Sequence, residues 1–214
     1  MKKNLTEIVF ILDRSGSMSG LEKDTIGGFN SLIGKQKKEE GEALISTVLF
    51  DDTSTVLYNR VPVSEVRKMT EDDYYVGGCT ALLDAVGGAI DHIGRVHKYT
   101  DKELVPEKTL FIITTDGMEN ASREYSYGQL KRKIERQKEK YGWEFLFLGA
   151  NIDAAETAAS FGIDRDHASD YHCDAEGTAL NYEVLCDVVG QVRKGNTIKA
   201  GWNDRIEKDF KRRK

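Results

Sequence analysis

Five side chains that end in oxygen occur where the chain changes from an apolar run or a glycine pair to a polar segment. Two are carboxylates and three are hydroxyls, so the set is hard and carries little charge. Oxygen ligands of this kind suit a hard divalent cation such as Mg²⁺, with Mn²⁺ and Ca²⁺ as alternatives. The predicted metal ligands are Asp13, Ser15, Ser17, Thr80 and Asp116.

The elements that must position these side chains are two buried strands. Residues 8–12 are all large and apolar, which is typical of a strand covered on both faces of a parallel sheet. Asp13 ends this run, and a second run at 109–115 ends at Asp116. Open α/β sheets bind ligands at the carboxyl ends of their strands. The two carboxylates are therefore expected at one edge of the sheet.

Strand and helix patterns alternate along the chain, which predicts a doubly wound, Rossmann-like α/β fold with helices on both faces. The short turn at 51–54 requires antiparallel pairing, so the six-stranded sheet is mostly parallel with one antiparallel edge strand. The expected strand order is 3-2-1-4-5-6. The predicted strands are 8–12, 43–50, 55–58, 109–115, 143–148 and 167–171, and the predicted helices are 21–39, 64–69, 80–95, 126–140, 153–161 and 174–193.

Composition is that of an ordinary globular protein. The 214 residues carry a net charge of −5, which argues against nucleic acid as a partner. No apolar stretch is long enough for a membrane span. Three widely spaced cysteines indicate reduced thiols and a cytoplasmic location. We expect one domain over residues 1–195, followed by an extension at 196–214 whose basic end, 211–214, is a solvated tail.

The five predicted ligands, in this order and in these element contexts, resemble the metal-ion-dependent adhesion site of von Willebrand factor type A domains. The Asp13-x-Ser15-x-Ser17 motif, Thr80 after glycines and Asp116-Gly117 carry the resemblance. It covers roughly residues 5–195. The turn at 50–52 and the segment 80–85 also look like prokaryotic intracellular members of this family.

The resemblance implies a binding module and not an enzyme. In such a module the three hydroxyls offer their oxygens to the ion, some of them directly, and the two carboxylates hold it directly or through water. A vacant position on the ion takes a Glu or Asp carboxylate from a protein partner. Intracellular members often work within multiprotein complexes. The low charge of the ligand set agrees with this, because the cation keeps its attraction for an external anion.

The main alternative is a Mg²⁺-dependent phosphatase of the haloacid dehalogenase type, which also begins with a hydrophobic strand ending in Asp. Such an enzyme needs a second Asp two residues after the first as its acid–base catalyst. Ser15 occupies that position here, which disfavours this reading. The glycine spacings of a P-loop and of a dinucleotide-binding loop are also absent from the sequence.

Several further residues lie near the predicted ligands in the sequence. Asp84 lies one helical turn after Thr80 and could bond a site water, but an ordinary helix position is favoured. A solvated loop is favoured for Glu119 and Asn120. Tyr74, Tyr75 and Tyr125 either border the site or pack in the core. The Gly87-Gly88 pair indicates close packing on the sheet, and the histidines at 92, 97, 167 and 172 show no ligand spacing.

Overall fold

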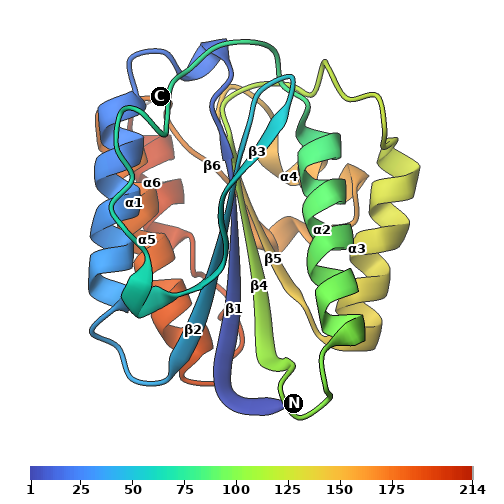
Figure 1. Ribbon diagram of the computed structural model, residues 1–214. Helices are drawn as coiled ribbons and strands as arrows, with labels where there is room; N and C mark the ends of the chain where they lie inside the picture. The colour runs from blue at the N-terminus through green and yellow to red at the C-terminus, as the bar shows by residue number, and fades with distance from the viewer. Residues whose placement is uncertain (214) are drawn as a thin grey trace.

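The chain folds into a sheet with helices on both faces (Figure 1). The computed structural model describes residues 1–213. Within them, no helix is long and apolar enough to cross a bilayer. The strands are β1 (Lys2–Asp13), β2 (Glu42–Phe50), β3 (Ser54–Pro62), β4 (Pro106–Thr115), β5 (Glu144–Gly149) and β6 (Ala168–Asp170). The helices are α1 (Glu22–Gln36), α2 (Leu82–Tyr99), α3 (Tyr127–Tyr141), α4 (Ala154–Ser160), α5 (Ala175–Arg193) and α6 (Asp204–Arg212), and the 3-10 turns are η1 (Gly16–Met18), η2 (Val63–Glu65) and η3 (Arg165–His167).

The sheet has six strands in the order β3-β2-β1-β4-β5-β6, and only β3 runs antiparallel to its neighbour. This confirms the predicted topology. The reason is the length of the connections. Only residues 51–53 join β2 to β3, too few for a parallel crossover, whereas every other pair of consecutive strands is joined through a helix.

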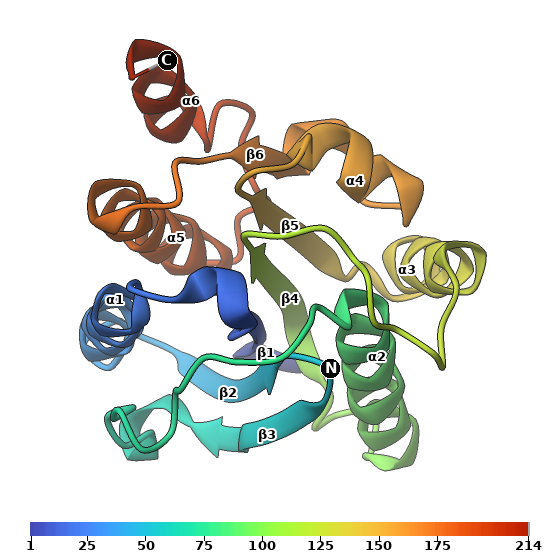
Figure 2. The same cartoon turned by 90° about the horizontal axis from the view of Figure 1, so that it is seen from above.

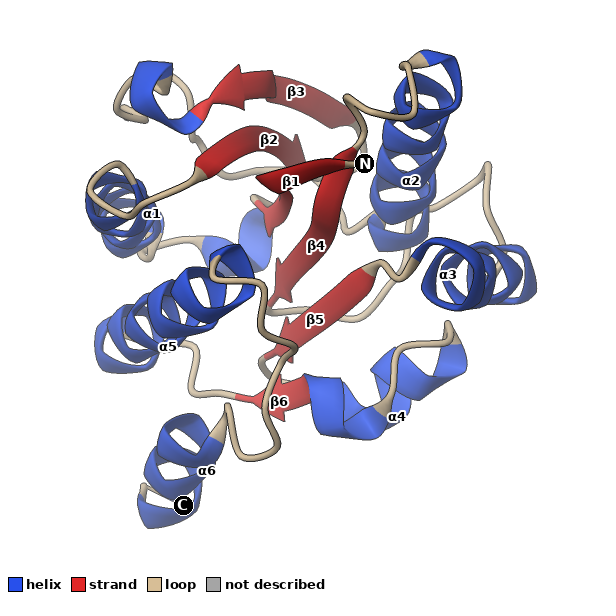
Figure 3. Ribbon diagram, turned by 90° about the horizontal axis from the view of Figure 1, so that it is seen from below, coloured by secondary structure: helices blue, strands red, loops and turns tan. Residues whose placement is uncertain are grey.

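The central strand β1 is buried on both faces because alternate side chains enter two separate cores. Ile8, Phe10 and Leu12 pack in the layer under α1 and α5. Val9 and Ile11 pack in the layer under α2, α3 and α4. The view from above shows these two helix layers on opposite sides of the sheet (Figure 2). The view from below shows α6 beyond α5, near the edge strand β6 (Figure 3).

The predicted short helix at 64–69 is wrong. Only the 3-10 turn Val63–Glu65 forms, and the chain then continues without helical hydrogen bonds. Side chains of α1 bind its backbone instead. Met69 donates its N–H to Asn30 Oδ1 (2.8 Å) and accepts a hydrogen bond from Asn30 Nδ2 (2.9 Å). Lys37 Nζ donates to the Val66 carbonyl (2.7 Å). Polar groups from a distant helix thus hold this segment in an extended path.

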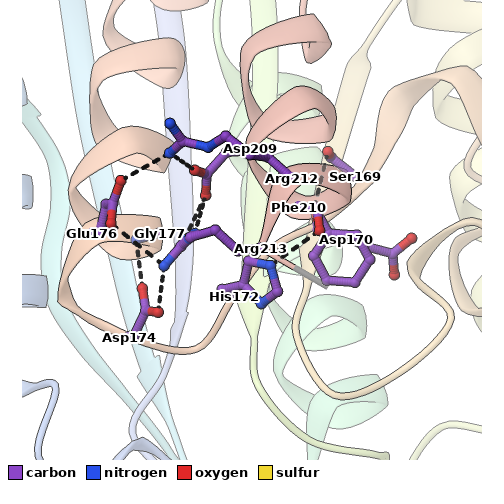
Figure 4. Close-up of polar contacts among 10 residues, drawn as sticks. All are labelled: Ser169, Asp170, His172, Asp174, Glu176, Gly177, Asp209, Phe210, Arg212 and Arg213. Carbon is purple, nitrogen blue, oxygen red and sulfur yellow. Dashed lines mark hydrogen bonds and ion pairs between the residues drawn. The ribbon is translucent and has the colours of Figure 1, made fainter.

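The predicted solvated tail is right in that Lys211 and Arg212 are exposed, but they are the end of a helix and not a tail; Lys214 lies outside the described residues. Residues 204–212 form α6, whose Ile206 is 2% exposed. Arg213 Nη1 lies 2.6 Å from Asp174 Oδ2, and the Arg213 guanidinium also pairs with Asp209 (Figure 4). Ionic contacts of α6 with the start of α5 therefore order this end of the chain. The domain boundary at residue 195 stays a prediction.

Candidate metal centre

Four of the five predicted ligands form a chain of hydrogen bonds at the carboxyl edge of β1 and β4. Asp13 ends β1, and Asp116 directly follows the neighbouring strand β4. Asp13 Oδ1 accepts the Ser15 N–H (2.7 Å). Ser15 Oγ lies 3.1 Å from Ser17 Oγ, which donates to Asp116 Oδ1 (2.5 Å). The structure thus brings together residues about a hundred positions apart in the sequence.

Thr80 lies beside the same group. A Cβ placed on Gly117 would be 3.5 Å from Thr80 Oγ1 and 3.4 Å from Ser17 Oγ. Both hydroxyls therefore flank the residue that follows Asp116. A side chain at position 117 would occupy the space next to both hydroxyls, and glycine leaves it free. All five predicted ligands meet at one place.

The loop of Asp13 and the glycine-containing loop before Thr80 are bonded to each other through the backbone. Gly16 donates its N–H to the Gly78 carbonyl (3.2 Å), and Gly77 donates to the Arg14 carbonyl (2.9 Å). Gly78 has a φ of +71°, and a Cβ there would lie 2.0 Å from Asp52 Oδ1. Only glycine suits this position, because the backbone is left-handed and the space is filled.

Burial separates the ligands from solvent on all but one side. Asp13, Ser15, Thr80 and Asp116 are at most 3% exposed. Ser17 is exposed, as are the neighbouring Gly16, Gly78 and Cys79. The group is therefore reached from the side of Ser17. A cation held there by the buried oxygens would keep a face open to a ligand from outside.

The Asp13 carboxyl is held in a strongly polar but dry setting. Burial raises its pKa, hydrogen bonds from Thr115 Oγ1 (2.6 Å) and from Ser15 lower it, and the charge of Asp116 raises it further; the net direction is upward. Two carboxyls that share a buried site repel each other. A divalent cation would remove this repulsion, so the donor set fits a hard ion.

The three tyrosines have three different positions. Tyr74 is 1% exposed and donates its hydroxyl to the Asp13 carbonyl (2.5 Å), so it supports the first loop from the core. Tyr75 is 58% exposed, and its ring covers the Arg14 guanidinium at 4.7 Å from the ring centroid. Tyr125 packs on α2, where a Cβ on Gly87 would come within 2.6 Å of its ring. The close packing predicted for the Gly87-Gly88 pair is confirmed for Gly87, although against the Tyr125 ring and not the sheet, and is wrong for Gly88, which is exposed with no atom within 4 Å of such a Cβ.

Asp84 lies in α2 and Asn120 is exposed in its loop, as favoured, but the side chains of Asp84, Glu119 and Asn120 also bind backbone groups. Asp84 accepts three backbone N–H groups of residues 123–125. Glu119 accepts the Leu83 N–H (2.9 Å) and two N–H groups of its own loop. Asn120 Oδ1 accepts the Thr80 N–H (2.9 Å). A carboxylate in the first turn of a helix predicts bonds to that helix's own N–H groups, whereas Asp84 binds a loop about forty residues away, so the sequence carries no signal for these bonds. No spacing in the sequence marks Glu119 or Asn120.

Sequence reasoning also missed Cys173, which lies in the loop between β6 and α5. Its thiol donates to Asp116 Oδ2 (3.4 Å). Burial, and then the charge of Asp116, raise the pKa of this thiol to about 12, so it stays protonated and can donate. On the other side of the same loop, His172 Nε2 lies 3.1 Å from the Phe210 carbonyl of α6 (Figure 4). The tertiary fold alone places this loop beside the site.

Comparison with known proteins identifies the architecture. No protein-family model matches the sequence, and no curated protein matches it either. Among solved structures, proximal thread matrix protein 1 from the mussel byssus superposes with a TM-score of 0.60 at 14% identity, over 87% of this chain and 46% of that one. A von Willebrand factor type A structure from Catenulispora acidiphila superposes with a TM-score of 0.56 at 15% identity, over 87% of this chain and 42% of that one.

The chain has the fold of a von Willebrand factor type A domain. At these identities the likeness concerns the fold alone, and the chain spans under half the length of the mussel protein. Two further matches are structures that contain a metal. One is the mussel protein with a zinc-occupied metal-ion-dependent adhesion site. It superposes with a TM-score of 0.60 at 14% identity, over 86% of this chain and 46% of that one. The other is manganese-loaded TRAP protein from Plasmodium vivax. It superposes with a TM-score of 0.56 at 16% identity, over 84% of this chain and 73% of that one.

Proposed function

We propose that this chain is a binding module that holds a divalent cation and uses it to capture a Glu or Asp carboxylate of a partner protein. The convergence of Asp13, Ser15, Ser17, Thr80 and Asp116 on one sheet edge, open at Ser17, carries the proposal. Mg²⁺ is the proposed ion, with Mn²⁺ or Ca²⁺ as alternatives. The zinc and manganese in structures of two proteins of this fold support a metal of this class.

Each side chain has a defined part in this proposal. Asp13 and Asp116 balance the charge of the ion, directly or through water, and the hydroxyls of Ser15, Ser17 and Thr80 complete an oxygen shell. The ion, when bound, supplies a positive centre for an acidic ligand. No general acid or base is needed for capture, so the module is proposed not to be an enzyme. A cytoplasmic site of action remains part of the proposal.

Metal binding is tested by thermal unfolding with MgCl₂, MnCl₂ or CaCl₂ and after addition of EDTA. An ion that binds only the folded state stabilises it, by about 2.7 kcal/mol at one hundred times its dissociation constant. We expect a rise in melting temperature that EDTA reverses. Asp13→Ala should lose this rise while its circular dichroism stays that of the parent. If Asp13→Ala is stabilised as much as the parent, the site assignment is wrong.

Partner capture is tested by retrieving proteins from native lysate on the immobilised parent and on Asp13→Ala, with Mg²⁺ or EDTA. A partner should bind the parent in Mg²⁺ only, and changing its contact Glu or Asp to the amide should remove most of the affinity. If no acid-to-amide change in the partner weakens binding, carboxylate capture is refuted. Turnover of a generic phosphate ester in Mg²⁺ by the parent, lost in Asp13→Ala, would support the phosphatase alternative instead.

A further inference from the structure

The loop that follows Asp116 holds the backbone of Thr80 from two directions. Thr80 donates its N–H to Asn120 Oδ1 (2.9 Å). Its carbonyl accepts the N–H groups of Asn120 (3.1 Å) and Ala121 (3.3 Å). Thr80 precedes α2, so helical hydrogen bonds do not fix its position. The loop of residues 117–125 therefore sets the position of the Thr80 hydroxyl relative to Asp116.

Glu119 shapes this loop and attaches it to α2. Its Oε1 accepts the N–H groups of Ala121 (3.0 Å) and Ser122 (2.8 Å), which closes a turn within the loop. Its Oε2 accepts the Leu83 N–H (2.9 Å) and the Ser122 hydroxyl (2.8 Å). The first N–H groups of a helix have no partner within the helix, and negative charge is favourable there. The Glu119 carboxylate meets both needs at the start of α2.

Asp84 fixes the far end of the same loop. Its Oδ2 accepts the Arg123 N–H (2.7 Å), and its Oδ1 accepts the N–H groups of Glu124 and Tyr125 (2.9 Å each). The Asp84 N–H in turn donates to Ser122 Oγ (3.1 Å). The Tyr125 ring then lies directly on α2 at Gly87, and the ring leaves no room for a side chain at that position. Both ends of the loop are thus anchored to the helix that follows Thr80.

We infer that Asp84 and Glu119 are positioning residues that hold Thr80 against Asp116 and so set the affinity of the metal site. This inference rests on the proposed function. Together the two carboxylates accept seven hydrogen bonds from the loop and from α2. Without the two carboxylates, these donors form hydrogen bonds with water, and the position of Thr80 is no longer fixed. Groups that orient metal ligands in this way typically contribute about 10- to 100-fold in metal affinity.

The test measures Mg²⁺ affinity by isothermal titration calorimetry in the parent, Asp84→Ala, Glu119→Ala, Asp84→Asn and Glu119→Gln. Each alanine variant should bind about 10- to 100-fold more weakly. The amide variants keep one acceptor oxygen and should recover part of the loss. Glu107→Gln is the matched control, because Glu107 Oε2 also accepts a backbone N–H, that of Asn4 (3.0 Å), at the opposite end of β4. It should bind Mg²⁺ like the parent.

Amide hydrogen exchange in EDTA provides a second readout that needs no metal. The amides of residues 121–125 should exchange faster in both alanine variants, while circular dichroism and the exchange of the β1 amides stay unchanged. Unchanged loop exchange, or unchanged Mg²⁺ affinity in both alanine variants, overturns the inference and leaves the proposed function standing. A parent that does not bind divalent ions overturns both. If an alanine variant fails to fold, its amide variant takes its place in these comparisons.

Discussion

At the scale of single residues, the buried carboxylate of Glu7 is balanced by defined partners. Glu7 lies in the central strand β1 with its side chain 0% exposed. Its carboxylate accepts a hydrogen bond from Arg60 Nε (2.7 Å) and contacts His97 Nε2 (2.7 Å). Burial raises the pKa of Glu7, but the hydrogen bonds from His97 and Arg60 outweigh it, and the net pKa is lowered. The buried charge is tolerated because each oxygen has a partner.

This pairing makes stability depend on pH through Glu7. The folded state favours the ionised form of Glu7 more than the unfolded state does, in which the pKa of a glutamate is 4.5. The contribution of Glu7 to the free energy of unfolding is therefore complete above pH 4.5 and is lost as the pH falls through the lowered pKa of the folded state. We expect Glu7→Gln to cost about 2 kcal/mol at pH 7. The cost should shrink in acid, as measured by urea unfolding from pH 7 to pH 3. A cost that does not change with pH would contradict this assignment.

At the scale of elements, both local and distant side chains complete the ends of the helices. Ser126 and Gln129 form a capping box at the start of α3, and Asp153 caps α4. The end of α1 is completed by Arg193 of α5. Its guanidinium donates to backbone carbonyls of residues 36, 39, 40 and 41, while only 6% of the residue is exposed.

Replacing Arg193 should therefore be costly. Arg193→Ala removes a donor from each of these carbonyls at the end of α1, and we expect a loss of about 3 kcal/mol in the free energy of unfolding. Lys194→Ala is the matched control, because Lys194 makes only an exposed pair with Glu39 (3.2 Å). It should change stability by less than about 1 kcal/mol. Equal losses in chemical denaturation would show that Arg193 does not cap α1.

The adjacent glycines of α2 give a second comparison at this scale. A Cβ on Gly87 would come 2.6 Å from the Tyr125 ring, whereas Gly88 has no atom within 4 Å of such a Cβ. Gly87→Ala should destabilise the protein by about 1–3 kcal/mol through overpacking. Gly88→Ala should stabilise it by about 0.5–1 kcal/mol through helix propensity. Thermal unfolding of both variants in EDTA measures this difference; a stabilising Gly87→Ala would disprove the packing.

At the scale of the whole molecule, one hydrophobic core lies on each face of the sheet. Helix α6 extends the core that lies under α1 and α5. Ile206 joins the core formed under α1 and α5, and Trp202 packs against it. Asn203 Nδ2 donates to the Ala168 carbonyl of β6 (3.1 Å). The chain after residue 195 is thus a structural cover for the edge strand, which would otherwise expose unpaired backbone groups.

Removing the apolar anchor of α6 should weaken this cover. Ile206→Ala should lower the free energy of unfolding by about 2–4 kcal/mol, since the side chain is 2% exposed. Val56, which is 56% exposed, is the control, and Val56→Ala should have little effect. Chemical denaturation measures both, and hydrogen exchange should show faster exchange first in β6 and α6. Equal stability of Ile206→Ala and the parent would mean that α6 does not dock.

The sequence alone determined the sheet topology and the five candidate ligands. Apolar runs, turn residues and loop lengths are local properties, and strand ends of a parallel sheet must meet at one edge. It could not determine the roles of Glu119, Asn120 or Cys173, because their partners lie in other elements and leave no periodic pattern.

Only the tertiary structure decided these contacts, the non-helical path of residues 66–69 and the docking of α6. In most of these cases backbone groups of one segment bond to side chains far away in the chain, as Met69 does with Asn30. Such bonds replace the local hydrogen bonds from which helices are predicted. Prediction from the local sequence therefore fails where distant polar side chains bind the backbone. It succeeds where burial and loop length determine the structure.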